Sequence, residues 1–182
     1  MFSHPFQIIT KDDCSIHFLS FSNALITAAR SARRRVWIFC YVINANLNRQ
    51  NDPVTLFLSI LRARRSSGCD IRFILDNPQI NRPNYHCNKY FMRRFMEWDF
   101  KFCTPPPRVT SHAKAILIDD KVLFIGSHNL AKSSLLNPLD CTVELRNDFL
   151  ILSFAETYKM LWESSSMISY VPADMPDAKY YG

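Results

Sequence analysis

The chain has 182 residues, of which 48% are hydrophobic and 21% are charged, and its net charge is +6. This length and composition exclude an intrinsically disordered segment, a fibrous repeat and a disulfide-stapled miniprotein, and they predict one domain over residues 1–182. No apolar run approaches the roughly 20 residues of a membrane-spanning helix, so we expect no stable membrane anchor.

Helices and strands alternate through the first half of the chain. Apolar residues at helical spacing predict an amphipathic helix over 20–33, and the continuous apolar run 36–43 predicts a strand that is buried on both faces. Asp52 before Pro53 is typical of a helix N-terminus. The later elements expected in this half are a helix from Pro53 that stops at Gly68, a strand over 70–76, a loop over 77–84, a helix near 85–97 and a short strand over 98–103.

The second half is richer in strands. The expected strands cover 109–119 and 122–126, with a tight turn at 120–121 between them, and 141–145, which continues through a bulge into 149–152. Ser153 and Glu156 form a capping box that is typical of the start of a last helix. The tail 166–182 is expected to be loose or to wrap a partner surface. Together the elements predict an α/β fold in which a mixed β-sheet is flanked by helices on both faces.

Positive charge lies mainly in the first half. Residues 1–100 contain 14 Lys and Arg against 7 Asp and Glu, whereas residues 101–182 contain 8 against 9. Guanidinium groups suit phosphate oxygens, so Arg33, Arg34 and Arg35 are candidate substrate-binding residues, and nucleic acid is a candidate partner. A helix dipole also favours cations at its last turn, which leaves a purely structural role open for this cluster.

The six cysteines include no CxxC pair, and the N-terminal residues show no basic stretch that leads into an apolar core. We therefore expect no signal peptide and a cytoplasmic location, where thiols stay reduced. A metal site built from Cys69, His86, Cys87 and Cys103 matches no zinc spacing, and we predict no metal and no other cofactor.

Residues that suit phosphate chemistry gather between 109 and 129. In an extended strand His112 and Lys114 project from the same face, while Ser127 and Asn129 follow the next strand. An imidazole can attack phosphorus, an ammonium group offsets negative charge, and the hydroxyl and amide groups donate hydrogen bonds to phosphate oxygens. The set therefore indicates a site for an anionic phosphodiester.

The spacing of these residues resembles the signature motif of the phospholipase D superfamily, which reads H-x-K-x4-D followed by G-S-x-N. The matching residues are His112, Lys114, Asp119, Gly126, Ser127 and Asn129. The resemblance implies the fold of that family, a covalent phosphohistidine at His112 and no requirement for a metal.

The resemblance also suggests roles for three further positions. Asp119 completes the motif and is expected to hold its structure through a cation or backbone donors. Glu144, on the strand after the motif, matches the acid that family members use to orient the histidine. His128 stands at the variable position of the second motif, where packing or substrate contact is expected.

Most family members carry two such motifs in one chain, whereas this sequence has one. The resemblance therefore implies a homodimer in which two copies of His112 meet at one phosphorus. In length the chain is similar to the single-motif nucleases of the family, and we expect a metal-independent phosphodiesterase that acts as a nuclease on DNA or RNA. The alternatives are a phospholipid or cardiolipin hydrolase with the same residues, and a nucleic-acid-binding module that is active only within a larger complex.

Overall fold

The computed structural model describes residues 9–45, 51–77, 84–164 and 166–170. A nine-stranded sheet crosses this part of the chain in the order β1-β2-β10-β8-β7-β3-β5-β6-β11. Its strands are β1 (Ile9–Lys11), β2 (Cys14–His17), β3 (Arg35–Cys40), β5 (Asp70–Leu75), β6 (Lys101–Thr104), β7 (Ala115–Ile118), β8 (Val122–Gly126), β10 (Thr142–Leu145) and β11 (Ile168–Tyr170). A short parallel pair joins β4 (Ile43–Asn44) to β9 (Leu130–Ala131).

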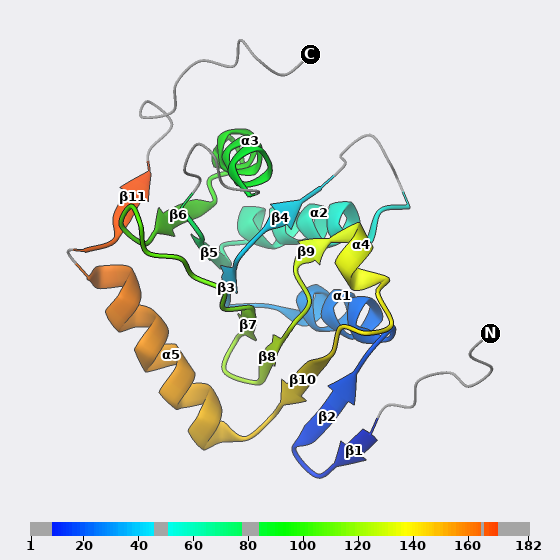
Figure 1. Ribbon diagram of the computed structural model, residues 1–182. Helices are drawn as coiled ribbons and strands as arrows, with labels where there is room; N and C mark the ends of the chain where they lie inside the picture. Colours follow the sequence, from blue (N-terminus) through cyan, green and yellow to red (C-terminus); the bar gives the residue numbers. More distant parts are fainter. Residues whose placement is uncertain (1–8, 46–50, 78–83, 165, 171–182) are drawn as a thin grey trace.

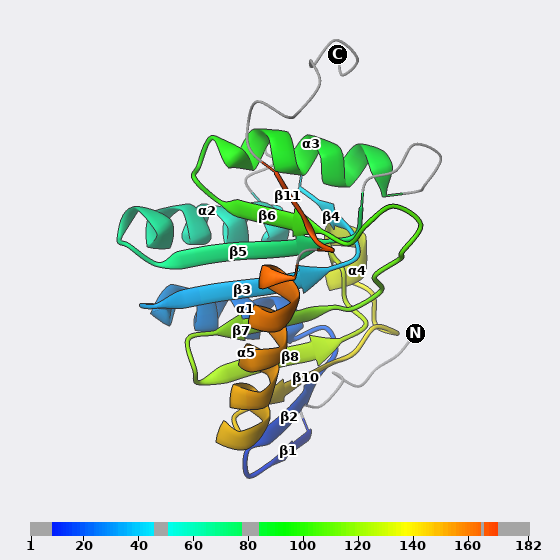
Figure 2. The ribbon, with the colours of Figure 1, turned by 90° about the vertical axis from the view of Figure 1, so that its left-hand side faces the viewer.

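The predicted fold class is confirmed. Strands β3, β5 and β6 run parallel and the other pairings in this sheet are antiparallel, so the sheet is mixed. Figures 1 and 2 show helices on both of its faces. The helices are α1 (Phe21–Ser31), α2 (Pro53–Ser66), α3 (Tyr85–Met96), α4 (Lys132–Leu135) and α5 (Asp148–Glu163).

Alternating residues of the central strands fill two separate cores. On β3, Val36 and Ile38 pack on the side of α1, α2 and α3, whereas Trp37 packs on the side of α5 with Ala155 and Tyr158. This alternation follows from the two-residue repeat of a strand. It explains why the apolar run in β3 is continuous, because both faces of the strand are covered.

Helix α2 begins where the sequence predicts. The carboxylate of Asp52 accepts hydrogen bonds from the backbone N–H groups of Val54 and Thr55, at 2.9 and 3.1 Å. Pro53 occupies the first helical position, where no N–H is needed. The helix stops at Ser66, and Gly68 follows with a φ of 89° that suits glycine.

Three predicted elements have different limits. The run 36–43 is divided between β3 and β4, and the strand predicted over 109–119 begins only at Ala115. Residues 149–152 belong to α5, not to a strand. The cap of that helix is Asn147, whose side chain accepts from the N–H of Leu150 at 3.1 Å. This cap and the helical spacing of the buried residues Ile151, Ala155 and Tyr158 outweigh the strand-like composition of the segment.

Part of the predicted tail lies in the sheet, because β11 pairs with β6. The rest of the tail, residues 171–182, lies outside the described residues, as do residues 78–83 of the predicted loop. Among the described helices none is long and apolar enough to cross a bilayer.

The sheet brings distant segments together at each end of its central strands. Strands β3 and β7 are antiparallel, with Phe39 beside Ala115 and Val36 beside Ile118. The residues after β3, before β7 and after β8 therefore meet at one end, which we name the His112 end. The residues before β3 and after β7 meet at the other, which we name the Asp119 end.

Candidate active site

His112 and Lys114 lie in the segment that leads into β7, not on a strand as predicted. The imidazole of His112 is exposed and stacks on the ring of Tyr41, with 4.1 Å between the ring centroids. The ammonium group of Lys114 donates to the carbonyl of His112 at 2.8 Å and lies 5.4 Å from the Tyr41 centroid. The two motif side chains are thus neighbours through this loop and through a shared aromatic ring.

Gly126 connects this loop to the second half of the motif. Its N–H donates to the carbonyl of Lys114 at 3.1 Å. A Cβ atom at this position would lie 2.3 Å from the carbonyl oxygen of Cys141. Only glycine therefore lets β8 approach β10 closely enough to bring Ser127 beside the start of β10.

Ser127 and Asn129 follow β8 at the same end of the sheet. The hydroxyl of Ser127 donates to a carboxylate oxygen of Asp140 at 2.8 Å and accepts from the N–H of Cys141 at 3.0 Å. The N–H of Asn129 donates to the hydroxyl of Ser134 at 2.9 Å. The side-chain oxygen of Asn129 is buried, and it accepts no hydrogen bond from the described residues.

Asp140 is a site residue that the sequence analysis missed. Besides Ser127, its carboxylate accepts from Ser134 at 2.7 Å and from Asn137 at 3.3 Å. Burial opposes ionisation, but the hydrogen bonds from Ser134 and Ser127 outweigh it and hold the pKa of Asp140 below its usual value. The available signal was its position directly before the strand predicted over 141–145; in the structure it lies two residues before β10.

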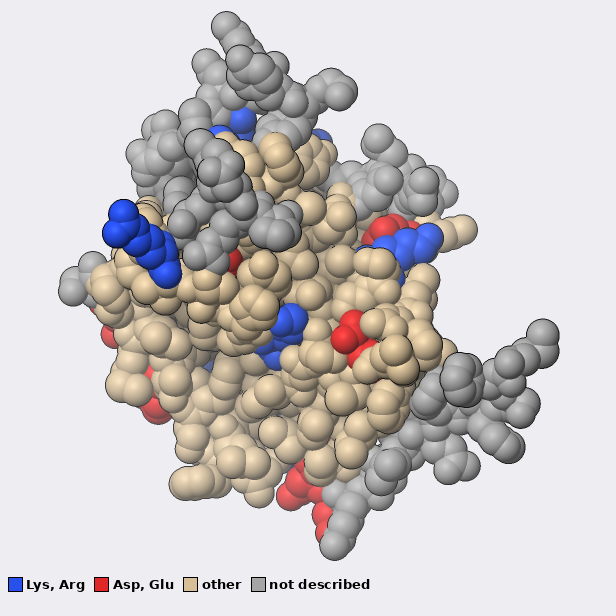
Figure 3. Space-filling view, viewed as in Figure 1, with Lys and Arg blue, Asp and Glu red and all other residues tan. Residues whose placement is uncertain are grey.

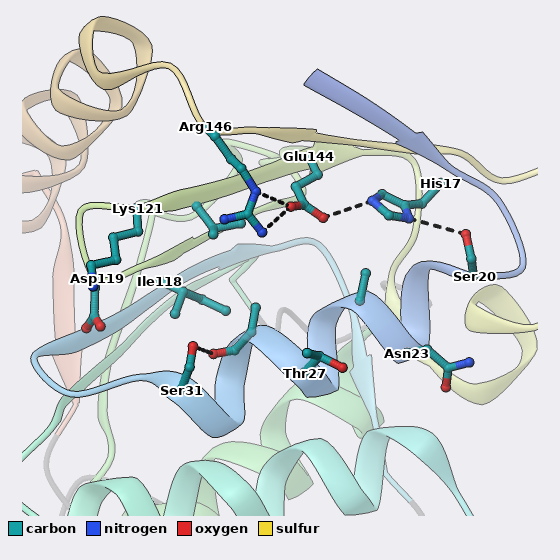
Figure 4. A pocket seen from close by; sticks show the side chains of 13 residues that line it. His17, Ser20, Asn23, Thr27, Ser31, Ile118, Asp119, Lys121, Glu144 and Arg146 are labelled. Carbon is teal, nitrogen blue, oxygen red and sulfur yellow. Dashed lines mark hydrogen bonds and ion pairs between the residues drawn. The ribbon is translucent and has the colours of Figure 1, made fainter. Parts of the chain in front are cut away.

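Glu144 lies on β10, two residues after Thr142, and its side chain contacts different residues from that of Asp140. Its carboxylate bonds to the imidazole of His17 at 2.9 Å and to the guanidinium of Arg146 at 2.6 Å. As Figure 4 shows, these side chains line a cavity of about 500 Å³ along α1, together with Ser20. The structure therefore pairs Glu144 with His17, and among the described contacts it has none with His112.

His128 is packed inside the molecule. Only 5% of it is exposed, and its Nδ1 atom lies 2.8 Å from the hydroxyl of Thr142. The ring also lies against Phe21, with 4.8 Å between the centroids. Burial lowers the pKa of His128. Of the two expected roles, the geometry favours packing over substrate contact.

Asp119 organises the opposite end of the sheet. Its carboxylate accepts hydrogen bonds from the backbone N–H groups of Arg33, Arg34 and Arg35, at 2.8–3.2 Å. It thereby holds the connection between α1 and β3. The expected structural role of Asp119 matches these backbone donors, which lie away from His112.

The three candidate substrate-binding arginines share the Asp119 end. The guanidinium groups of Arg34 and Arg35 are paired with Asp120, and that of Arg35 also covers the Trp37 ring at 4.4 Å. Strand β3 separates Arg35 from the His112 end by about 17 Å, at roughly 3.3 Å per residue. Figure 3 looks onto the side where β4, β9 and α4 lie, and its Lys and Arg side chains are scattered singly. The arginine cluster is thus not part of the surface around His112.

Comparison with models of protein families shows to which family the chain belongs. The model described as "Cardiolipin synthase, PLD-like domain" matches residues 25–162, which is about three quarters of the chain. The chain belongs to the phospholipase D superfamily. Among curated proteins no significant match was found.

Three solved structures share this fold, of which Nuc is described as a phospholipase D family member. Nuc from Salmonella typhimurium is 17% identical with a TM-score of 0.67, and the match covers 86% of this chain and 97% of Nuc. NucT from Helicobacter pylori is 20% identical with a TM-score of 0.65, and the coverage is 86% and 98%. Phosphatidylserine synthase from Haemophilus influenzae is 11% identical with a TM-score of 0.69, and the match covers 92% of this chain but 43% of the synthase.

The described residues form no cluster of side chains that could bind a metal ion. No group of three or more His, Cys, Asp or Glu side chains is placed among them to hold an ion. Cys69 and Cys103 are buried, at the start of β5 and within β6, while Cys87 lies on α3.

Proposed function

We propose that this phospholipase D-like phosphodiesterase is a nuclease whose nucleophile is His112. The observation that carries the proposal is the meeting of His112, Lys114, Ser127 and Asn129 at one end of the sheet. An exposed imidazole next to an ammonium group suits attack on a phosphodiester, whose negative charge otherwise repels nucleophiles.

The proposed reaction has two steps. A ring nitrogen of His112 forms a bond to phosphorus, and the bond from phosphorus to the leaving oxygen breaks as that oxygen takes a proton. Water then attacks phosphorus and passes a proton to the group that protonated the leaving oxygen, while the bond between phosphorus and the ring nitrogen of His112 breaks. We assign the proton donor to His112 of a second copy, because the chain holds one motif and a twofold dimer would supply its mate.

In this mechanism Lys114 and the side-chain amide of Asn129 stabilise the charge on the phosphate oxygens. Ser127 joins them only by turning its hydroxyl proton from Asp140 toward the phosphate. Asp140 bonds to Ser127, whereas Glu144, the carboxylate expected to orient the histidine, bonds to His17. The Asp140 carboxylate orients the hydroxyl groups of Ser127 and Ser134, which both donate to it.

Nucleic acid is the proposed substrate because the fold shared with Nuc and NucT spans nearly the whole of those proteins. The match covers nearly all of Nuc and NucT but less than half of the synthase. The net charge of +6 also favours a polyanion.

A phospholipid is the second candidate substrate. The segments that flank the site expose the apolar residues Val109, Leu136 and Leu139, the last at 84%. The arginine cluster at the Asp119 end does not border the site. Exposed apolar side chains beside the site suit contact with acyl chains, whereas binding of nucleic acid through several cations weakens steeply with salt.

The test is incubation of the purified protein, in excess EDTA, with single- and double-stranded DNA, RNA and anionic phospholipid vesicles. We expect consumption of a nucleic acid, abolished by His112→Asn. Lys114→Ala should slow turnover roughly 100-fold, through loss of about 3 kcal/mol of transition-state stabilisation. Lys159→Ala, on the outer surface of α5, is the matched control and should keep the wild-type rate.

The results also separate the alternatives. Cleavage of the lipid alone, with little dependence on salt, would replace the nuclease assignment by a phospholipase. Binding of nucleic acid without cleavage by any variant would favour a binding module that needs a larger complex. Wild-type cleavage by His112→Asn would overturn the assignment of the nucleophile.

A further inference from the structure

The ring of Tyr41 contacts both functional side chains of the motif. It stacks on His112 with an interplanar angle of 27°, and the ammonium of Lys114 lies above the same ring. Among the described residues neither ring nitrogen of His112 makes a hydrogen bond. The contact with Tyr41 is therefore the interaction that restricts this exposed imidazole in the described structure.

The loop that carries Tyr41 is held by a buried amide. Asn88, on α3, is fully buried, and its NH₂ group donates to the carbonyl of Tyr41 at 2.9 Å and to that of Asp76 at 3.1 Å. Its oxygen accepts from the N–H of Ile43 at 3.0 Å. One side chain thus fixes the backbone on both sides of the turn from β3 to β4.

The loop that carries His112 is held in the same region by a buried carboxylate. Asp76 follows β5 and is 1% exposed. One of its oxygens accepts from the N–H of Ser111 at 2.6 Å, directly before His112. The other accepts from the amide of Asn84 at 2.7 Å. Asp76 and Asn88 are in turn joined through the Asp76 carbonyl, so both loops are anchored to one buried network.

We infer that Tyr41 is a positioning residue, which holds the His112 imidazole in the orientation for attack, and that Asp76 and Asn88 fix the two loops that make this contact. The inference rests on the proposed function of His112. Attack on phosphorus needs a defined approach of one ring nitrogen, and small displacements of a reacting group slow reactions strongly. An exposed imidazole without hydrogen bonds would otherwise rotate among several rotamers.

Nuclear magnetic resonance of the imidazole tests the contact without reference to activity. The ring of Tyr41 should shift the His112 ring protons upfield, and their signals are assigned by their loss in His112→Asn. We expect Tyr41→Phe to keep the shift and Tyr41→Leu to abolish it. Tyr90→Leu, an exposed tyrosine on α3, is the matched control and should change nothing.

Kinetics then test the functional part. Tyr41→Leu should lower kcat roughly 10- to 100-fold with KM changed less than about twofold, and Tyr41→Phe should restore the rate. Asn88→Asp, which removes the donors to Tyr41, should move the His112 signals in the same direction as Tyr41→Leu. Unchanged signals in both variants, or unchanged kcat in Tyr41→Leu, would overturn the inference. If the wild type cleaves none of the substrates, the proposed function fails, while the ring shift still decides whether Tyr41 holds His112.

Discussion

Single residues at the His112 end differ in how the fold restrains them. Asp140 is tied by three side-chain hydrogen bonds, whereas His112 rests on one aromatic ring. This contrast suits a site in which a fixed carboxylate orders the donors around the phosphate while the nucleophile stays accessible. It also makes Asp140 a residue whose ionisation can be followed through stability.

We predict that Asp140→Asn lowers the free energy of unfolding at pH 7 by about 1 kcal/mol. The neutral amide accepts weaker hydrogen bonds than the ionised carboxylate that it replaces. The folded pKa of Asp140 lies below the unfolded value of about 3.9. Its contribution is therefore complete above that value and is lost as the pH falls through the folded pKa. Urea unfolding of both proteins at pH 7 and below pH 3 measures this, and the difference should shrink at the lower pH.

Glu163→Gln serves as the control for that experiment, since Glu163 is exposed near the end of α5. It should leave the stability unchanged at both pH values. A difference between Asp140→Asn and wild type that stays constant with pH would show that the effect comes from packing and not from the charge.

Among the elements, the pairing of β8 with β10 builds the site. The register places Gly126 beside Thr142, and the backbone of Cys141 occupies the space that a side chain at 126 would need. The glycine of the motif is thus required by the contact between the two strands.

We predict that Gly126→Ala destabilises the fold by about 1–3 kcal/mol and impairs turnover. The new methyl group must displace the backbone at Cys141, to which Ser127 is hydrogen-bonded. Gly68→Ala is the informative comparison. Its Cβ would meet no atom within 4 Å, but φ is 89°, so we expect a cost of about 1–2 kcal/mol from backbone strain with turnover unchanged. Urea unfolding and kcat separate the two effects, and equal kcat in both variants would contradict this account of Gly126.

The sequence predicts the presence of these helices and strands better than the residues at which they begin and end. Asp52 and Pro53 locate the start of α2 because the cap is local, and the alternation of helix and strand predicts the α/β class. The predicted start of β7 was wrong, because the N–H of Ser111 bonds to the side chain of Asp76 and not to a neighbouring strand. The role of Glu144 could not be read from the chain, because its partner His17 is 127 residues away in sequence. Asp140 was missed for the same reason, as its bond to Ser127 depends on the β8–β10 register.

On the scale of the whole molecule, the arginine cluster and the candidate active site lie at opposite ends of the sheet. The sequence predicts the excess of arginine but not its place, which depends on the antiparallel pairing of β3 with β7. Arg35 is used in pairing with Asp120 and in covering Trp37. The guanidinium of Arg35 therefore does not border His112.

The proposed sharing of one site by two chains makes a quantitative prediction. Wild type and His112→Asn are unfolded together in equal amounts and refolded, so that the subunits combine at random. If one site needs both copies of His112, only dimers of two wild-type chains are active, and activity falls to about a quarter of that of the same total amount of wild type. If each chain works alone, about half remains. Refolding with Lys159→Ala in place of the inactive variant should retain full activity, which excludes losses from refolding itself. A value near one half would therefore remove the second His112 as the proton donor and require that donor within a single chain.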